Sequence, residues 1–161
     1  MKKPIVFFVL FVALASACSK TDDESDPAPD PQILSAIIGS WAYDTVTYDG
    51  ITYSYEHTQD CTKDLFQFYN QEGKEFDFEE QYVSNCDNCA QCALTSTNLQ
   101  WQLSGSTISL YFGDQFVAQL EILEVTEQII RYKRRFDINQ DGIDDDVEIS
   151  GLPYDPYGNF E

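Results

Sequence analysis

One acidic stretch has the residue types and spacing of a calcium-binding loop. Residues 137–148 read Asp-Ile-Asn-Gln-Asp-Gly-Ile-Asp-Asp-Asp-Val-Glu, with oxygen ligands at positions one, three, five, seven, nine and twelve. Hard oxygen ligands at this spacing wrap one cation as the chain turns, and they suit calcium better than magnesium. The stretch therefore predicts a weak, structural calcium site with these ligands: Asp137, Asn139, Asp141, the carbonyl of Ile143, Asp145 and Glu148.

Two features separate this stretch from the helix–loop–helix form of such a site. Position eight, which is usually apolar, is Asp144, and the residues on both sides alternate as strands do. The alternative is a hairpin turn without metal, because Asp, Asn and Gly favour turns in any case. The sequence leaves both interpretations open.

The N-terminal residues have the layout of an export signal. Lys2 and Lys3 precede the ten apolar residues 5–14, which are too few to span a bilayer. Residues 14–18, Leu-Ala-Ser-Ala-Cys, resemble a bacterial lipobox. That resemblance implies a signal peptide over residues 1–17 and diacylation of Cys18, and several acyl chains on one residue anchor a protein stably. A plain secretory signal that ends near a cysteine is the alternative.

An acidic, proline-rich stretch follows and completes a tether over residues 18–31. Its first part, Ser-Lys-Thr-Asp-Asp-Glu, resembles the tag that directs Bacteroidota lipoproteins to the cell surface, which implies a surface-exposed outer-membrane protein. The whole chain has 28 acidic and 9 basic residues and a net charge of −19. This charge argues against binding of nucleic acid and against electrostatic adhesion to anionic lipid. The membrane is therefore expected as a partner only through the lipid anchor.

Beyond the lipidated residue the chain has four cysteines: Cys61, Cys86, Cys89 and Cys92. An even number in an exported chain predicts two disulfides. We favour Cys61–Cys86 with Cys89–Cys92, followed by Cys61–Cys92 with Cys86–Cys89. Four thiolates could alternatively bind zinc, although an oxidising compartment removes thiolates. A redox-active Cys89–Cys92 pair would need a helix start to lower its thiol pKa, and the sequence shows none there.

The sequence contains no common catalytic motif. It lacks Gly-x-Ser-x-Gly, His-Glu-x2-His and a phosphate-binding loop. His57 is the single histidine, and its polar surroundings predict an exposed loop residue. We therefore expect no catalytic residue and a protein that is not an enzyme.

Hydrophobic alternation with a period of two dominates the chain from Trp41 onward. This period is typical of half-buried antiparallel strands. A short amphipathic helix over Pro31 to Ile38, ended by Gly39, precedes them. Short connections predict an up-and-down meander, and closure into a barrel of about eight strands protects its edges. The strands are expected at roughly residues 41–48, 51–56, 63–70, 74–82, 98–104, 106–112, 115–125, 128–137 and 145–150.

Three groups of residues carry a family resemblance: Gly39-x-Trp41, Cys61-x2-Asp64-x-Phe66-x-Phe68 and Leu99-x-Trp101-x-Leu103-x-Gly105. With the preceding helix, they resemble the lipocalin or calycin pattern, most of all the lipocalin-like domain of small Bacteroidota lipoproteins. The resemblance implies an all-β barrel over residues 32–152, followed by a tail over residues 153–161. It also implies that Arg134 or Arg135 packs against Trp41.

The resemblance implies a cup for a small, largely apolar ligand, and two functions follow from how full that cup is. An open interior favours such a ligand, whereas a filled barrel with exposed aromatic side chains favours recognition of a surface protein or glycan. Large side chains are expected to point inward and to form either the cavity or the core: Trp41, Phe66, Phe68, Phe76, Phe78, Trp101, Leu110 and Phe116.

Overall fold

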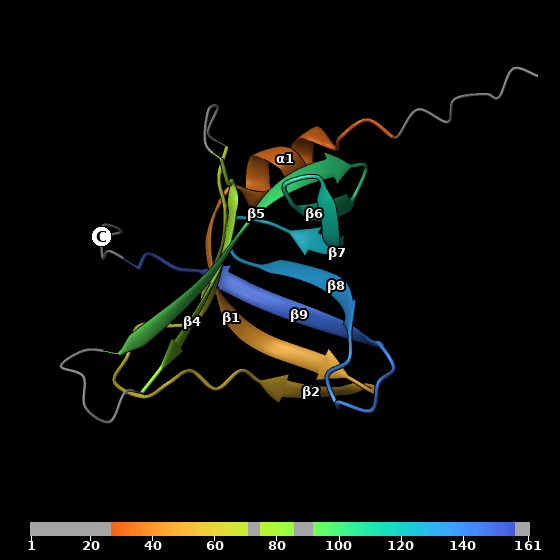
Figure 1. Cartoon of the computed structure of the whole chain (residues 1–161). Coiled ribbons are helices and arrows are strands. Elements are labelled where there is room, and N and C mark those ends of the chain that lie inside the picture. Colours follow the sequence, from red (N-terminus) through yellow and green to blue (C-terminus); the bar gives the residue numbers. More distant parts are fainter. Residues whose placement is uncertain (1–26, 71–74, 86–91, 157–161) are drawn as a thin grey trace, which may run out of the picture.

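The computed structural model describes residues 27–70, 75–85 and 92–156 (Figure 1). The predicted signal peptide, Cys18, the first part of the tether, Cys86, Cys89 and the end of the tail lie outside the described residues. Within the described residues, no helix is both long enough and apolar enough to cross a membrane.

One short helix and nine strands make up the fold. The helix, α1, spans Pro31–Ile37 and confirms the predicted one. The strands are β1 (Gly39–Tyr48), β2 (Ile51–Ser54), β3 (Leu65–Phe68), β4 (Phe78–Ser84), β5 (Ala93–Ser104), β6 (Thr107–Phe112), β7 (Gln115–Val125), β8 (Ile130–Phe136) and β9 (Asp145–Pro153).

The strands form the predicted closed, antiparallel, up-and-down barrel. The sheet order is β2-β1-β3-β4-β5-β6-β7-β8-β9, and an additional β1–β9 pairing closes the ring. The barrel has eight strands, β1 and β3 to β9, because β2 pairs only with the second half of β1, at positions 45–48. Its first half, at positions 39–42, pairs with β3.

Helix α1 lies across one end of the barrel (Figure 1). The Asp30 side chain caps it by accepting a hydrogen bond from the Gln32 amide at 2.8 Å. At its other end the indole Nε1 of Trp41 donates to the Ile37 carbonyl at 3.0 Å, and both residues are buried. The predicted Gly39-x-Trp41 pattern therefore attaches the helix to the barrel.

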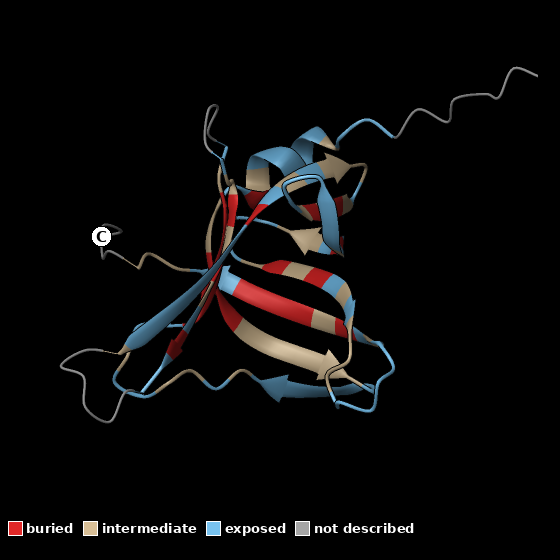
Figure 2. Ribbon diagram, viewed as in Figure 1, coloured by how far each residue is buried: buried red, intermediate tan, exposed pale blue. Residues whose placement is uncertain are grey.

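Apolar side chains fill the barrel interior near α1. Figure 2 shows the buried stretches along the strands. Phe66 and Phe68 are fully buried, and Phe66 meets the Tyr132 ring edge-on at 5.5 Å. Phe66 also packs against β9 at Gly151, where a Cβ would stand 2.8 Å from the Phe66 ring. Any larger residue at position 151 would displace this ring. Buried aliphatic side chains complete the core: Ile37, Leu99, Ile108, Leu110, Leu120, Ile122, Ile130, Val147 and Ile149.

Strand β7 contains a bulge that reverses the predicted direction of Phe116. Leu110 pairs with Ala118, but the next residue, Tyr111, pairs with Phe116, so Val117 is an extra residue. Phe116 thus shares the outer face with Tyr111, contacts its ring at 6.0 Å and is 56% exposed. The prediction that Phe116 points inward is wrong for this reason.

The β4–β5 hairpin is displaced from its predicted position. Strand β4 begins at Phe78 rather than near residue 74, and β5 begins at Ala93 rather than residue 98. Residues 93–98 are all exposed, although alternate residues of a strand point to opposite faces. Neither face of this ribbon is covered, so the segment carries no hydrophobic alternation from which a strand could be predicted.

A disulfide joins Cys61 to Cys92, with 5.9 Å between the two Cα atoms. The favoured pairing of Cys61 with Cys86 and Cys89 with Cys92 is therefore wrong, and the second choice gave the Cys61 partner correctly. Ser84 pairs with Ala93, so the chain leaving β4 and the chain entering β5 lie side by side. Sequence distance could not distinguish between cysteines on these two adjacent segments.

Candidate functional site: the open end of the barrel

Burial falls step by step along the inward face of β4 and β5. Phe78 is 2% exposed, Glu80 is 7% exposed and Tyr82 is 41% exposed. Thr97 and Thr95, which stand opposite Glu80 and Tyr82 on β5, are both exposed. The interior is therefore filled near α1 and becomes accessible toward the other end.

Other strands show the same gradient. On β6, Leu110 is fully buried, but Phe112, the next residue of the same face, is 60% exposed. On β8, Tyr132 is buried and the Arg134 side chain is 24% exposed. The residues that face inward where burial is lost are here called the open end: Glu80, Tyr82, Thr97, Phe112, Ala118 and Arg134.

An ion pair crosses the interior at the open end. Arg134 of β8 donates from Nη1 to Glu80 Oε1 of β4 at 3.1 Å, and the Tyr43 hydroxyl donates to the same oxygen at 3.0 Å. The pKa of Arg134 is raised: burial alone lowers it, but Glu80 and the neighbouring tyrosines together outweigh that effect. The pair holds both charges inside the barrel without a net charge.

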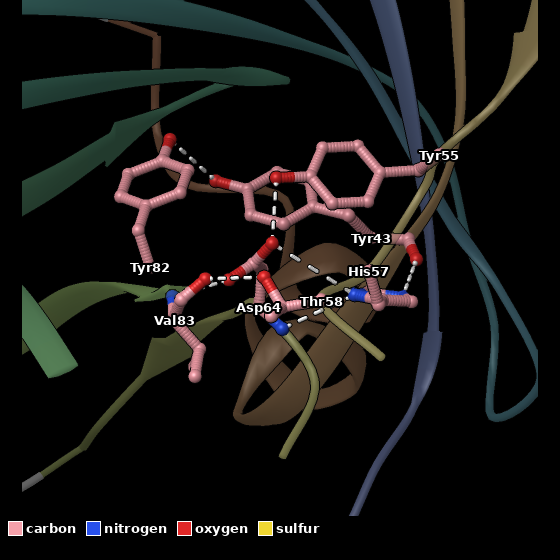
Figure 3. A network of polar contacts seen from close by, with 7 residues as sticks. All are labelled: Tyr43, Tyr55, His57, Thr58, Asp64, Tyr82 and Val83. Atoms are coloured by element: carbon pink, nitrogen blue, oxygen red, sulfur yellow. Dashed lines mark hydrogen bonds and ion pairs between the residues drawn. The ribbon is translucent and has the colours of Figure 1, made fainter. Parts of the chain in front are cut away.

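Three tyrosine rings form a stack (Figure 3), and the Tyr43 hydroxyl connects this stack to the ion pair. Tyr43 is the middle ring, with Tyr55 at 4.9 Å and Tyr82 at 6.0 Å between ring centroids. The planes differ by 23° and 13°, and the hydroxyls of Tyr43 and Tyr82 are 3.3 Å apart. The stack ends at Tyr82, the most exposed of the three.

The phenols of this cluster are hydrogen-bonding groups rather than bases. Burial raises the pKa values of Tyr43 and Tyr132 well above the ordinary value, and the Glu80 carboxylate adds to the rise at both, although Arg134 opposes it at Tyr132. Burial also raises the pKa values of Tyr82 and Tyr55, and the hydrogen bond to Asp64 adds to the rise at Tyr55. All four hydroxyls therefore stay protonated at neutral pH and serve binding rather than proton abstraction.

His57 supports this cluster: it lies in a loop, as predicted, but its side chain is only 20% exposed, so the prediction that it is exposed is wrong. Its Nδ1 accepts from the Asp64 amide at 3.1 Å, which leaves Nε2 to donate to the Tyr43 carbonyl at 2.9 Å (Figure 3). The buried Asp64 carboxylate accepts from the Tyr55 hydroxyl at 2.9 Å and from the Val83 amide. These bonds fix the β2–β3 loop against the tyrosine stack.

A groove of about 490 Å³ adjoins the open end where β7 and β8 separate. The two strands pair from Leu120 opposite Arg134 to Val125 opposite Ile130, so the first residues of β7 have no partner in β8. The lining of the groove includes the apolar residues 116–118. Basic and acidic residues also line it in equal number: Lys133, Arg134 and Arg135 with Glu121, Asp144 and Asp146.

The predicted calcium loop is ordered by its own hydrogen bonds. Asp137 accepts from the Asp141 and Gly142 amides at 3.0 and 2.8 Å, and Asn139 accepts from Asp141 at 2.9 Å. Glu148, the predicted twelfth-position ligand, instead pairs with Arg131 on the sheet at 3.2 Å. In the part of the chain that the structure describes, no group of three acidic, histidine or cysteine side chains is arranged to hold a metal. The residues thus fit a calcium site only in part, and calcium binding stays a prediction.

The structure brings together most of the side chains predicted for the cavity or core. Trp41, Phe66, Phe68, Phe78 and Leu110 are buried. The Trp101 side chain is partly buried and donates to the Tyr69 carbonyl at 3.3 Å. Phe76 is partly exposed and stacks on Phe112 at 6.1 Å.

Neither arginine takes the position implied against Trp41. Arg134 pairs with Glu80 and lies over the Phe136 ring at 5.6 Å, and Arg135 forms an exposed ion pair with Asp146 at 3.4 Å. Sequence reasoning also missed the Glu80–Arg134 pair. Its signal is a charge on the inward face of each strand, in Phe78-x-Glu80-x-Tyr82 and in Tyr132-x-Arg134-x-Phe136.

Comparison with known proteins agrees with this architecture. The sequence matches no curated protein. A family model described as a lipocalin-like domain matches residues 37–132, which is more than half of the chain. The lipocalin-like fold is typically one that binds rather than catalyses. This match and the closed eight-stranded barrel show that the chain belongs to the lipocalin-like domain family.

Proposed function

We propose that this protein is a non-catalytic, lipid-anchored protein of the cell envelope that binds a small, largely apolar ligand at the open end of its barrel. The observation that carries the proposal is the burial gradient, from a filled interior at α1 to exposed Tyr82 and Phe112 at the other end. Apolar rims with a few convergent polar groups are typical of small-molecule sites.

Ligand binding is tested by filling the open end. Thr97 and Ser96 are adjacent exposed residues of β5, and Thr97 faces inward whereas Ser96 faces outward. N-phenyl-1-naphthylamine, a neutral dye that fluoresces in apolar surroundings, serves as the probe. We expect dye emission to rise with the wild type and Ser96→Trp but not with Thr97→Trp. Equal emission with both variants would place the dye elsewhere.

The lipid anchor is tested separately. The support for it is the lipobox resemblance at residues 14–18 and the acidic tether that follows. We expect the full-length protein to fractionate with membranes and to carry acyl chains on Cys18, and Cys18→Ser to appear in the aqueous fraction. A Cys18→Ser protein that stays with membranes to the same extent as the wild type would contradict the anchor.

A second candidate function is recognition of a surface protein or glycan, and exposed aromatic rings favour it. Phe112 and Phe116 are 60% and 56% exposed at the two sides of the β6–β7 turn. The Phe76 ring stacks on Phe112, and the Tyr111 ring contacts Phe116. Loss of cell-surface or glycan binding on Phe116→Ser, with dye binding unchanged, would favour this function.

A further inference from the structure

We infer that the open end takes a flat, uncharged ring that stacks on Tyr82 and presents a hydrogen-bonding edge to Arg134 and Glu80. The inference rests on the proposed ligand-binding function and narrows it from a largely apolar ligand to a defined chemical class. Three features carry it: an unfinished aromatic stack, an unpartnered donor beside that stack, and a local balance of charge.

The tyrosine stack ends in an accessible ring. Tyr43 has an aromatic ring on each side, Tyr55 at 4.9 Å and Tyr82 at 6.0 Å. Among the described residues, Tyr82 has Tyr43 as its single aromatic neighbour, and it is 41% exposed. Aromatic rings prefer offset stacking at these separations, so a flat ligand continues the series on Tyr82. A puckered, saturated ring of the same size makes a poorer contact with the face.

The polar groups beside the stack require a ligand that can hydrogen-bond. Arg134 has five N–H donors, and within the described chain its Nε is buried without an acceptor. Glu80 accepts hydrogen bonds from Tyr43 and Arg134 and therefore lies next to both. A purely apolar ligand would cover the exposed part of the Arg134 guanidinium without giving it an acceptor, which is costly. The ligand must therefore bring an oxygen or nitrogen to this edge.

The charges around the open end favour a neutral ligand. Glu80 compensates Arg134 inside the barrel. The ion pair and the adjoining groove together hold three basic side chains and four acidic ones, and Arg135 is already paired with Asp146. An anion would meet this nearly balanced, slightly negative site on a chain of net charge −19, and a cation would compete with Arg134 for Glu80.

The test uses four related probes and two positions on the disulfide-bonded domain without its signal peptide and Cys18, residues 19–161. The probes are 2-naphthol, which is flat and hydroxylated, decahydro-2-naphthol, which is saturated, naphthalene, which lacks the hydroxyl, and 2-naphthoate, which is an anion. Amide chemical shifts in ¹⁵N-labelled protein give both the affinity and the location of each probe. The variants are Tyr82→Leu, Tyr82→Phe and, as a matched control on another exposed tyrosine, Tyr53→Leu.

We expect 2-naphthol to bind most tightly and to shift amides of β4, β5 and β8 around the open end. Tyr82→Leu should weaken it about five- to tenfold, the value of one aromatic stack, whereas Tyr82→Phe and Tyr53→Leu should leave it nearly unchanged. Decahydro-2-naphthol binding as tightly as 2-naphthol, or 2-naphthoate binding more tightly, would overturn the inference and leave the proposed function standing. The absence of open-end shifts with every probe would overturn both.

Discussion

At the scale of single residues, the Glu80–Arg134 pair places two charges inside a small barrel, and its two members differ in exposure. Glu80 is buried, whereas a quarter of the Arg134 side chain is exposed. Removing the arginine alone leaves the buried Glu80 carboxylate without a counter-charge, with the Tyr43 hydroxyl as its remaining hydrogen-bond donor, which typically costs about 3 kcal/mol. We expect Arg134→Met to be less stable than the double variant Glu80→Gln/Arg134→Met, as measured by urea unfolding. A double variant that is less stable than Arg134→Met would show that the loss of stability does not come from the uncompensated charge of Glu80.

Asp77 gives a residue-level prediction for pH dependence. Burial raises its pKa from the ordinary value of 3.8, and hydrogen bonds from the Trp101 and Asp77 amides only partly offset the rise. Because the folded pKa is raised, the carboxyl favours folding fully below pH 3.8 and loses that contribution as the pH rises through the raised pKa. Asp77→Asn keeps an acceptor for Trp101, so we expect it to be slightly more stable than the wild type at pH 7, by less than about 1 kcal/mol, and no more stable at pH 3. Thermal unfolding at the two pH values measures this, and a variant less stable at both would contradict it.

At the scale of elements, the Cys61–Cys92 disulfide ties the β2–β3 loop to the start of β5. It closes a loop with a sequence separation of 31. On the chain-entropy model, a disulfide that closes a loop of this length stabilises the folded state by about 3 to 4 kcal/mol. We expect Cys61→Ser/Cys92→Ser to lose most of this stability in urea unfolding. A loss below about 1 kcal/mol would show that the hydrogen bonds of His57 and Asp64 hold the loop by themselves.

The bulge in β7 predicts that substitutions of two large residues of this strand change the free energy of unfolding by very different amounts. Phe116 lies outside and is 56% exposed, whereas Leu120 is 2% exposed in the core. Phe116→Ser should change the free energy of unfolding by less than about 0.5 kcal/mol, and Leu120→Ala should cost about 2 to 5 kcal/mol. A large loss on Phe116→Ser would mean that this side chain packs inward, as its position in the sequence pattern suggested.

These elements also show what the sequence can and cannot predict. Alternation of apolar residues predicted the nine strands and the barrel, because burial of one face leaves that record at residues such as Leu99, Trp101 and Leu103. Alternation failed for residues 93–98, where neither face of the strand is buried, and at Val117, where the extra residue of the bulge shifts the pattern. The sequence left an open cup as one alternative, but the Glu80–Arg134 pair at the open end was missed because charges on an inward face break the apolar pattern.

At the scale of the whole molecule, the barrel has two unlike ends. Pro27 and Ala28, which precede α1, contact the β5–β6 turn: the Ser104 hydroxyl donates to the Pro27 carbonyl at 3.1 Å and the Gly105 amide donates to the Ala28 carbonyl at 3.3 Å. The chain that leads to the proposed anchor therefore reaches the barrel on the side of α1, where the interior is filled.

Native mass spectrometry of the domain without its signal peptide and Cys18, residues 19–161, tests ligand binding at the open end most directly. The protein is recovered from an oxidising compartment as the wild type, as Thr97→Trp, which fills the open end, and as Ser96→Trp, which adds the same side chain on the outer face. We expect a small organic adduct on the wild type and on Ser96→Trp, and none on Thr97→Trp. A bare polypeptide mass for the wild type, or the same adduct on all three proteins, would contradict a ligand site at the open end.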